Sequence, residues 1–172
     1  MDPRPIAIRT LDAGLRIDRR AITRALRLLD GGAPGRPEAR EWALASRGEL
    51  SVVFLPPAAL ARLHARFLSD PSETDVITFP GDPALGTAGE ICISARAAAR
   101  FAKKRKGDFS GELTLYLVHG WLHLAGYDDR KPKDRRAMRR AEARAMRFLR
   151  AAGAIPKFRE RFSLTQESPL PL

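Results

Sequence analysis

The chain is poor in cysteine. Cys92 is the only one among 172 residues, which excludes an intramolecular disulfide and any metal site built from several thiolates. Because Cys92 lies in the apolar run Ile91–Ile93, we interpret it as a small buried hydrophobic side chain rather than a catalytic nucleophile. Any catalytic chemistry therefore has to be sought in other residue types.

Long apolar runs are also missing. No stretch approaches the roughly 20 residues that a membrane-spanning helix needs, and residues 1–5 lack the apolar core of a signal peptide. We therefore expect a cytoplasmic protein with no membrane partner. The 172 residues, of which 44% are hydrophobic and 30% charged, fit one globular domain with one core.

Acidic residues are in short supply. Lysine and arginine number 31 against 20 aspartates and glutamates, which gives a net charge of +11. A charge of this size favours a polyanionic partner such as nucleic acid, through attraction to phosphates and counterion release. The alternative is a general preference for arginine in an Ala- and Arg-rich protein, and charge alone says nothing about fold or chemistry.

Short apolar stretches alternate with helical patterns along the chain. Strands are expected at Ile6–Ile8, Leu50–Leu55, Asp75–Phe79 and Glu90–Ile93. Helices are expected from the cap Asp18 to about Leu29, after Pro56 and Pro57, from the cap Ser94 to the basic run 103–106, from Glu112 to about Leu124, and from Pro132 to Gly153, with Met138, Ala141, Ala145 and Leu149 facing the core. Breaks are expected at 30–35 and 69–72. This order indicates an α+β fold, a single compact domain over residues 1–155 with about five helices packed on a small mixed sheet, and a loose tail at 156–172.

The most informative segment runs from His119 to Asp129. His119 and His123 are four residues apart in a helical stretch, so their imidazoles project from one face, one turn apart. Two histidines at this spacing can hold one zinc ion, although such pairs also occur for structural reasons. Gly126 is expected to end the helix and turn the chain back, so that Asp128 or Asp129 supplies a third ligand.

Two imidazoles and one carboxylate leave the fourth zinc position open for water. Zinc lowers the pKa of this water toward neutrality and polarises a phosphoryl oxygen, and both effects suit phosphodiester hydrolysis. We therefore expect catalysis to depend on His119 and His123 through a zinc-bound water, with no protein general base identified. A zinc peptidase of the H-E-x-x-H kind has a glutamate after the first histidine; here Gly120 stands there, which argues against a metal-dependent peptidase.

The segment resembles the signature H-G-x-L-H-L-x-G-Y-D-H of the YbeY endoribonuclease family. Every fixed position matches except the last, where Asp129 replaces a histidine. Residues 74–80, TDVITFP, resemble the family's T-D-V-L-S-F-P, and residues 89–94, GEICIS, resemble its G-D-I-x-I-S. The resemblance extends over residues 5–150.

This resemblance implies a single-strand-specific, zinc-dependent endoribonuclease that acts in 16S rRNA 3′-end maturation and ribosome quality control, with the small ribosomal subunit as a partner. It implies a compact α+β fold with a central sheet of about four strands and a zincin-like helix that carries the metal ligands. It also implies that one zinc ion is held by His119, His123 and Asp129, the last in place of the family's third histidine. The alternative for Asp129 is a solvated residue beside Arg130.

Two further positions depart from the family. Leu68 stands where the family has an arginine thought to act on the RNA, and His64 stands where it has an asparagine. Leucine cannot replace a bidentate phosphate contact, and Arg66 could substitute only if it points into the cleft. These departures keep a second hypothesis open, a ribosome-associated assembly factor with structural zinc and weak or lost nuclease activity.

Two basic clusters are candidates for RNA binding. Lys103, Lys104, Arg105 and Lys106 lie at an expected helix end, and Arg135, Arg136, Arg139 and Arg140 lie along the last helix. Either group could position an RNA backbone through phosphate contacts. The alternative for each is a solvated helical face.

Overall fold

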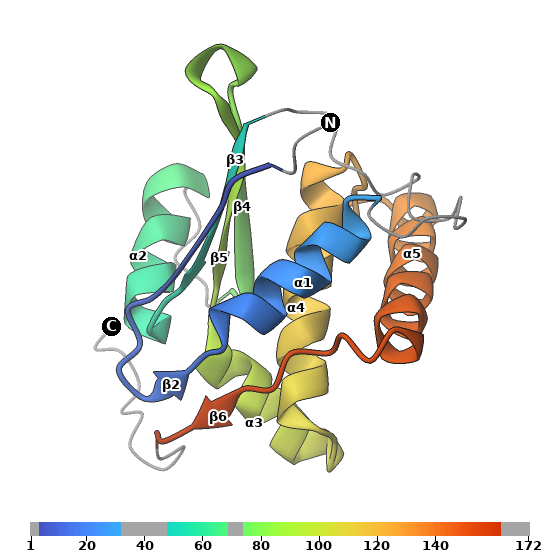
Figure 1. Cartoon of the computed structure of the whole chain (residues 1–172). Helices are drawn as coiled ribbons and strands as arrows, with labels where there is room; N and C mark the ends of the chain where they lie inside the picture. The colour runs from blue at the N-terminus through green and yellow to red at the C-terminus, as the bar shows by residue number, and fades with distance from the viewer. Residues whose placement is uncertain (1–3, 32–47, 69–73, 163–172) are drawn as a thin grey trace.

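A computed structural model of the chain describes residues 4–31, 48–68 and 74–162, shown in colour in Figure 1. Its centre is a four-stranded sheet with the order β1-β3-β5-β4. The strands are β1 (Ile6–Thr10), β3 (Glu49–Phe54), β4 (Val76–Pro80) and β5 (Thr87–Ile93). Strands β1, β3 and β5 run parallel, and β4 pairs antiparallel with β5 at one edge. The sheet is therefore mixed, as the sequence and the family resemblance predict.

Within the described residues, five α-helices surround this sheet. They are α1 (Arg19–Leu29), α2 (Pro57–Leu68), α3 (Ala95–Arg105), α4 (Phe109–Leu124) and α5 (Pro132–Ala151), with a 3₁₀ turn η2 at Pro83–Leu85. Figure 1 shows α2 on one side of the sheet and α1, α4 and α5 on the other. The larger apolar core lies on the α4 side, and a smaller cluster containing Leu60 and Cys92 lies under α2. The α+β prediction is confirmed.

The starts of α1 and α3 follow the capping residues read from the sequence. Asp18 accepts hydrogen bonds from the first backbone N–H groups of α1, and Ser94 does the same for α3. Helix α4 begins at Phe109, three residues before the predicted Glu112, because the side chain of Asp108 accepts the Gly111 N–H at 2.6 Å. The core side chains predicted for α5 are all buried: Met138, Ala141, Ala145 and Leu149.

Part of the segment expected to be a loose tail is packed. The short strand β6 (Arg159–Glu160) pairs antiparallel with β2 (Leu15–Arg16). Phe158 is buried, and its ring lies edge-on to Phe54 and Phe109. The expectation is therefore corrected for residues 156–162, because burial of an aromatic ring fixes this segment on the core. The rest of the tail, the break at 32–35 and the loop at 69–72 lie outside the described residues.

Helix α4 packs unusually close to the sheet. A Cβ atom on Gly120 would lie 2.5 Å from Cγ2 of Ile91 in β5 and 3.2 Å from Cγ1 of Val76 in β4. Only glycine permits this approach, which fixes the rotation of α4 about its own axis. No helix among the described residues is long and apolar enough to cross a membrane.

Candidate metal centre

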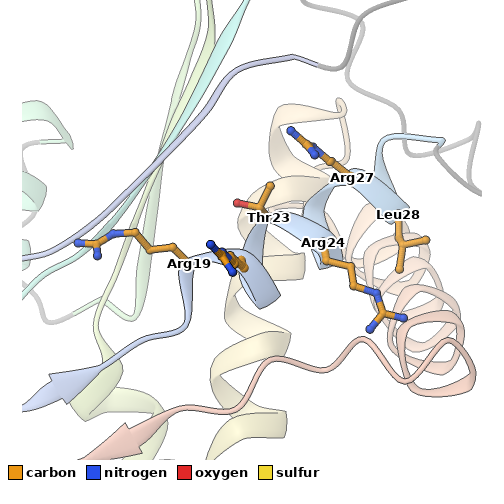
Figure 2. A pocket seen from close by; sticks show the side chains of 6 residues that line it. Arg19, Thr23, Arg24, Arg27 and Leu28 are labelled. Carbon is orange, nitrogen blue, oxygen red and sulfur yellow. The ribbon is translucent and has the colours of Figure 1, made fainter.

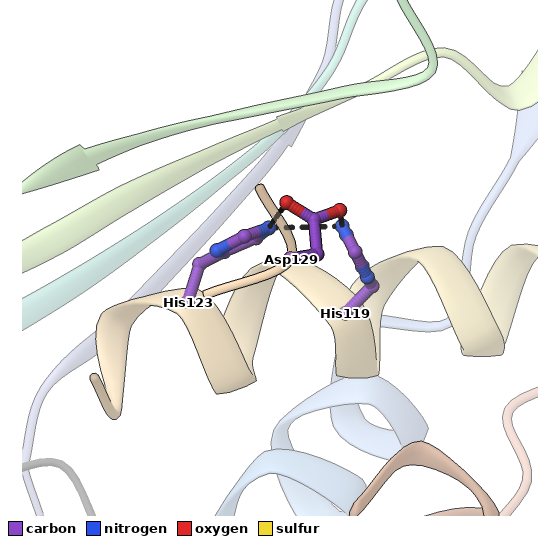
Figure 3. A group of neighbouring side chains, drawn as sticks. All are labelled: His119, His123 and Asp129. Atoms are coloured by element: carbon purple, nitrogen blue, oxygen red, sulfur yellow. Dashed lines mark hydrogen bonds and ion pairs between the residues drawn. The ribbon is translucent and has the colours of Figure 1, made fainter. Parts of the chain in front are cut away.

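Helix α4 presents two imidazoles at its solvent-accessible side. With Gly120 turned to the sheet, His119 and His123 project from the same side of α4, as Figure 3 shows, and His119 borders a hollow next to β4 and α5. Their Nε2 atoms lie 3.0 Å apart, and about a quarter of each side chain is exposed. The spacing predicted from the sequence therefore produces a converging pair that solvent can reach.

A glycine turn brings a carboxylate back over this pair. Gly126 has φ +95°, and the Tyr127 N–H donates to the carbonyl of Leu122 at 3.0 Å, a helix-ending turn that favours glycine. After the turn, the Asp129 carboxylate faces both rings, as Figure 3 shows. Its Oδ2 lies 3.8 Å from Nε2 of His119, and its Oδ1 lies 3.9 Å from Nε2 of His123.

The neighbouring aspartate has a different role. Asp128 Oδ1 accepts the backbone N–H groups of Asp129 at 2.8 Å and of Arg130 at 3.3 Å. These hydrogen bonds lower the pKa of Asp128 and hold the loop that carries Asp129. Of the two carboxylates considered from the sequence, the structure brings Asp129 to the histidines and uses Asp128 to shape the loop.

The other nitrogen of each imidazole has an oxygen acceptor as partner. Nδ1 of His119 lies 2.7 Å from Oε1 of Glu142, and Nδ1 of His123 lies 3.1 Å from the carbonyl oxygen of Tyr127. A carbonyl oxygen and an ionised carboxylate can only accept, so each Nδ1 carries the proton. In the neutral imidazole, the form that binds metal ions, both Nε2 atoms then present lone pairs toward one another.

This arrangement fits a divalent cation. Two unprotonated nitrogens only 3.0 Å apart repel each other unless a positive charge lies between them. Two donor atoms on one tetrahedral ion at about 2.0–2.1 Å are separated by about 3.3 Å, close to the observed spacings. The ligand atoms of His119, His123 and Asp129 all lie within 4.8 Å of one another, so the group could bind a metal ion.

The protonation state of His123 also supports a metal site. Burial lowers the pKa of His123 below its ordinary value, and the nearby His119 lowers it further, while Asp129 acts in the opposite direction. The imidazole therefore stays neutral at neutral pH. Neutral imidazole is the form that binds metal ions.

Glu142 is the site residue that sequence reasoning missed. It lies on α5, its carboxylate is largely buried, and it accepts the Nδ1–H of His119. A carboxylate behind a metal-binding histidine fixes the tautomer and orientation of the ring. The available signal was its spacing: Glu142 falls four residues after Met138 and three before Ala145, an acidic residue on a face that otherwise packs in the core.

A cavity of about 260 Å³ opens beside His119. Its described walls come from the start of β4 and the two residues before it, from α4 and from α5, and combine apolar with polar and acidic side chains: Thr74, Asp75, Val76, Leu115, Tyr116, His119 and Glu142. Burial, followed by the charge of Asp75, raises the pKa of Tyr116, so this hydroxyl remains protonated. A substrate in the cavity would meet both a hydroxyl and carboxylates next to the histidines.

The predicted RNA-binding residues lie apart from the three ligand residues. Lys103, Lys104, Arg105 and Lys106 are exposed at the end of α3. This basic run lies just before the first residue of α4, Phe109. His119 comes ten residues further along α4, and the two positions are about 15 Å apart along the helix axis. Arg66 is exposed on α2 with its guanidinium 5.5 Å from the ring centre of Phe67, and it is not among the described walls of the cavity. The side chain of Leu68 lies outside the described part of the chain.

Comparison with known proteins identifies the family. The model of the family described as Endoribonuclease YbeY matches residues 36–150, well over half of the chain. The chain belongs to the YbeY endoribonuclease family. The family resemblance noted in the sequence is thereby confirmed.

Individual relatives agree with this assignment. The chain is 42% identical over 118 residues to Endoribonuclease YbeY of Chlamydia abortus, covering 64% of this chain and 75% of the relative. It is 41% identical over 115 residues to that of Chlamydia felis, covering 62% and 73%. The solution structure of TM1509 from Thermotoga maritima matches with a TM-score of 0.57 at 21% identity, over 86% of this chain and 91% of that one, which supports the fold.

Proposed function

We propose that this protein is a zinc-dependent endoribonuclease that cuts single-stranded RNA, acting in 16S rRNA 3′-end maturation and ribosome quality control on the small subunit. One observation carries the chemical part of the proposal. Two imidazoles with protonated Nδ1 atoms direct their Nε2 lone pairs to a shared point, and a carboxylate faces the same point. The family membership supplies RNA as the substrate class.

His119, His123 and Asp129 would hold the ion. Two imidazoles and one carboxylate form a donor set typical of catalytic zinc sites that keep a position open. When bound, a zinc ion provides Lewis-acid activation of a phosphoryl oxygen and of water at neutral pH. The exposed 41% of the Asp129 side chain leaves this position accessible to substrate from solvent.

The remaining residues orient these ligands. Glu142 and the Tyr127 carbonyl hold the Nδ1–H groups, so neither ring can turn its protonated nitrogen toward the ion. Gly120 keeps α4 against the sheet, and a glutamate at this position would point into Ile91 rather than toward the histidines. The chain therefore lacks the geometry for the base of an H-E-x-x-H peptidase, in agreement with an RNA substrate.

The cavity beside His119 suits the nucleoside part of RNA better than a phosphate. Asp75 and Glu142 repel a phosphate group, whereas their carboxylates and the Tyr116 hydroxyl can pair with the amino groups of a base or with a ribose hydroxyl. Leu115 and Val76 supply apolar surface for a base plane. The phosphodiester would then lie at the histidines and its nucleoside in the cavity.

Cleavage of an end-labelled single-stranded RNA tests the proposal. The wild-type protein should cut the RNA, lose this activity after chelation, and regain it with added zinc. His119→Ala should be inactive. His64→Ala is the matched control, because His64 is the one histidine outside the candidate site and should be dispensable. Equal cleavage by the His119→Ala and wild-type proteins would show that the activity does not come from this site.

A second candidate function is an assembly factor with a structural ion and little nuclease activity. Leu68 favours it, since the family resemblance places an RNA-directed arginine there and leucine makes no phosphate contact. Substituting Leu68→Arg distinguishes the two. A large gain of cleavage with unchanged zinc content would favour the assembly factor for the natural chain, whereas strong cleavage by the wild type excludes it.

A further inference from the structure

Helix α1 carries a basic face that the metal centre does not use. Its eleven residues contain four arginines and no acidic side chain. All four arginines are exposed and surround a hollow of about 410 Å³, together with Thr23 and Leu28: Arg19, Arg20, Arg24 and Arg27. Figure 2 shows several of these side chains spreading outward from the helix.

Two of the guanidinium groups are held in fixed positions. Arg24 donates to the carbonyl of Ala152 at 2.9 Å and to that of Gly153 at 3.2 Å, just beyond the end of α5. Arg19 donates through Nε to the carbonyl of Ile8 at 2.9 Å. These bonds orient the guanidiniums and leave their positive charge uncompensated, because the partners are neutral carbonyl groups.

Other arginines near this part of the fold are neutralised. Arg4 pairs with Asp30, and Arg96 pairs with the buried Asp12 at 3.0 Å. Within the described residues, none of the four α1 arginines forms an ion pair with a carboxylate. The face therefore concentrates positive charge that an external anion can satisfy.

The side chains of α1 favour a nucleic-acid backbone over a membrane surface as the anionic partner. A helix that binds a membrane surface needs an apolar face for the lipid, but the apolar side chains of α1 are already buried in the core: Ile22, Ala25, Leu26 and Leu29. Guanidinium groups match phosphate oxygens in bidentate geometry without reading sequence. The proposed function supplies RNA as the phosphate-bearing partner.

We propose that the arginine face of α1 binds the phosphate backbone of RNA at a site separate from the metal centre. This inference rests on the proposed RNA substrate. The described lining of the hollow comes from α1, whereas that of the cavity beside His119 comes from β4, α4 and α5. The helix also lies before residue 36, where the match to the family model begins. The face anchors RNA whose other part reaches the histidines.

Fluorescence anisotropy with a long single-stranded RNA, in the presence of a chelator so that no cleavage occurs, tests this proposal. The variant is Arg20→Ala/Arg27→Ala, because neither side chain caps a neighbouring element. It should weaken binding on the order of tenfold at 0.1 M salt and reduce the slope of log K against log salt by about 1.4, for two lost phosphate contacts. Arg20→Lys/Arg27→Lys should keep most of the slope, since it keeps the charge.

The matched control is Arg62→Ala/Arg147→Ala. These arginines are exposed on α2 and α5, belong to neither basic cluster, and give the same loss of charge. Wild-type affinity in the α1 variant would overturn the proposal, as would an equal loss in the control variant, which would assign the effect to net charge. A loss confined to anionic vesicles, with RNA binding unchanged, would also overturn it.

His119→Ala separates this proposal from the proposed function. It should bind the long RNA as tightly as the wild type in this assay while losing cleavage. The α1 variant should instead show a raised KM and an unchanged kcat with zinc present. Failure of the nuclease activity would leave the binding result intact, so the two outcomes can be told apart.

Discussion

Glu142 provides the sharpest test of how the fold prepares the site. Its carboxylate lies 2.7 Å from Nδ1 of His119, and only 18% of its side chain is exposed. We predict that Glu142→Ala weakens zinc binding although the residue does not touch the ion. Glu142→Gln should have a smaller effect, because glutamine keeps an oxygen acceptor and loses the charge.

The expected size follows from the kind of contact removed. Loss of the partner behind a metal-binding histidine typically weakens metal affinity by about 10–100-fold, or about 1.4–2.7 kcal/mol. A charge-assisted hydrogen bond is roughly twice as strong as a neutral one. The loss in Glu142→Gln, expressed as a free energy, should therefore be about half of that in Glu142→Ala.

Competition with a chromophoric zinc chelator measures these affinities directly. Asp134→Asn is the control, because it removes an acidic charge from the first turn of the same helix without touching His119. Zinc affinity equal to that of the wild type in Glu142→Ala would refute the role assigned to this carboxylate. An equal loss in Asp134→Asn would assign the effect to overall charge instead.

Three further predictions concern packing, reactivity and pH. Gly120→Val should destabilise the fold by about 3 kcal/mol in urea unfolding, because its side chain would overlap Ile91; an unchanged midpoint would contradict the close helix–sheet contact. Burial and the adjacent Glu90 raise the pKa of Cys92 to about 12, so iodoacetamide at pH 8 should label the unfolded but not the native chain; rapid native labelling would refute this. The pKa of His123 is lowered from 6.5, so its imidazole stays neutral until the pH falls below 6.5. Zinc affinity should decline as the pH is lowered further, because protons then compete for the imidazole. A decline that is already complete at pH 7 would contradict this prediction.

Local patterns in the sequence were sufficient to predict the metal helix. The spacing of His119 and His123 and the turn residue Gly126 act within one or two helical turns, so their effects are visible without the rest of the fold. The choice between Asp128 and Asp129 depended on the family resemblance, and the structure places Asp129 at the histidines. In this segment, the arrangement predicted from local patterns is the one found in the folded structure.

Contacts between segments that are distant in sequence could not be predicted from local patterns. The partnership of Glu142 with His119 depends on how α5 packs against α4, which no local pattern specifies. Strands β2 and β6 have two residues each, too few to show an alternation of apolar and polar side chains. They pair with each other although most of the chain separates them in sequence. Phe158, just before β6, is buried, but its position in a proline-containing tail gave little indication of packing.

An X-ray absorption spectrum of the zinc-loaded protein tests the central claim most directly. We expect one zinc ion per chain with two imidazole nitrogens and oxygen ligands at about 2.0–2.2 Å. The imidazole contribution should fall by half in His123→Ala. A zinc environment with no imidazole ligand, or one identical in the wild type and the His119→Ala/His123→Ala double variant, would show that these side chains do not form the metal centre.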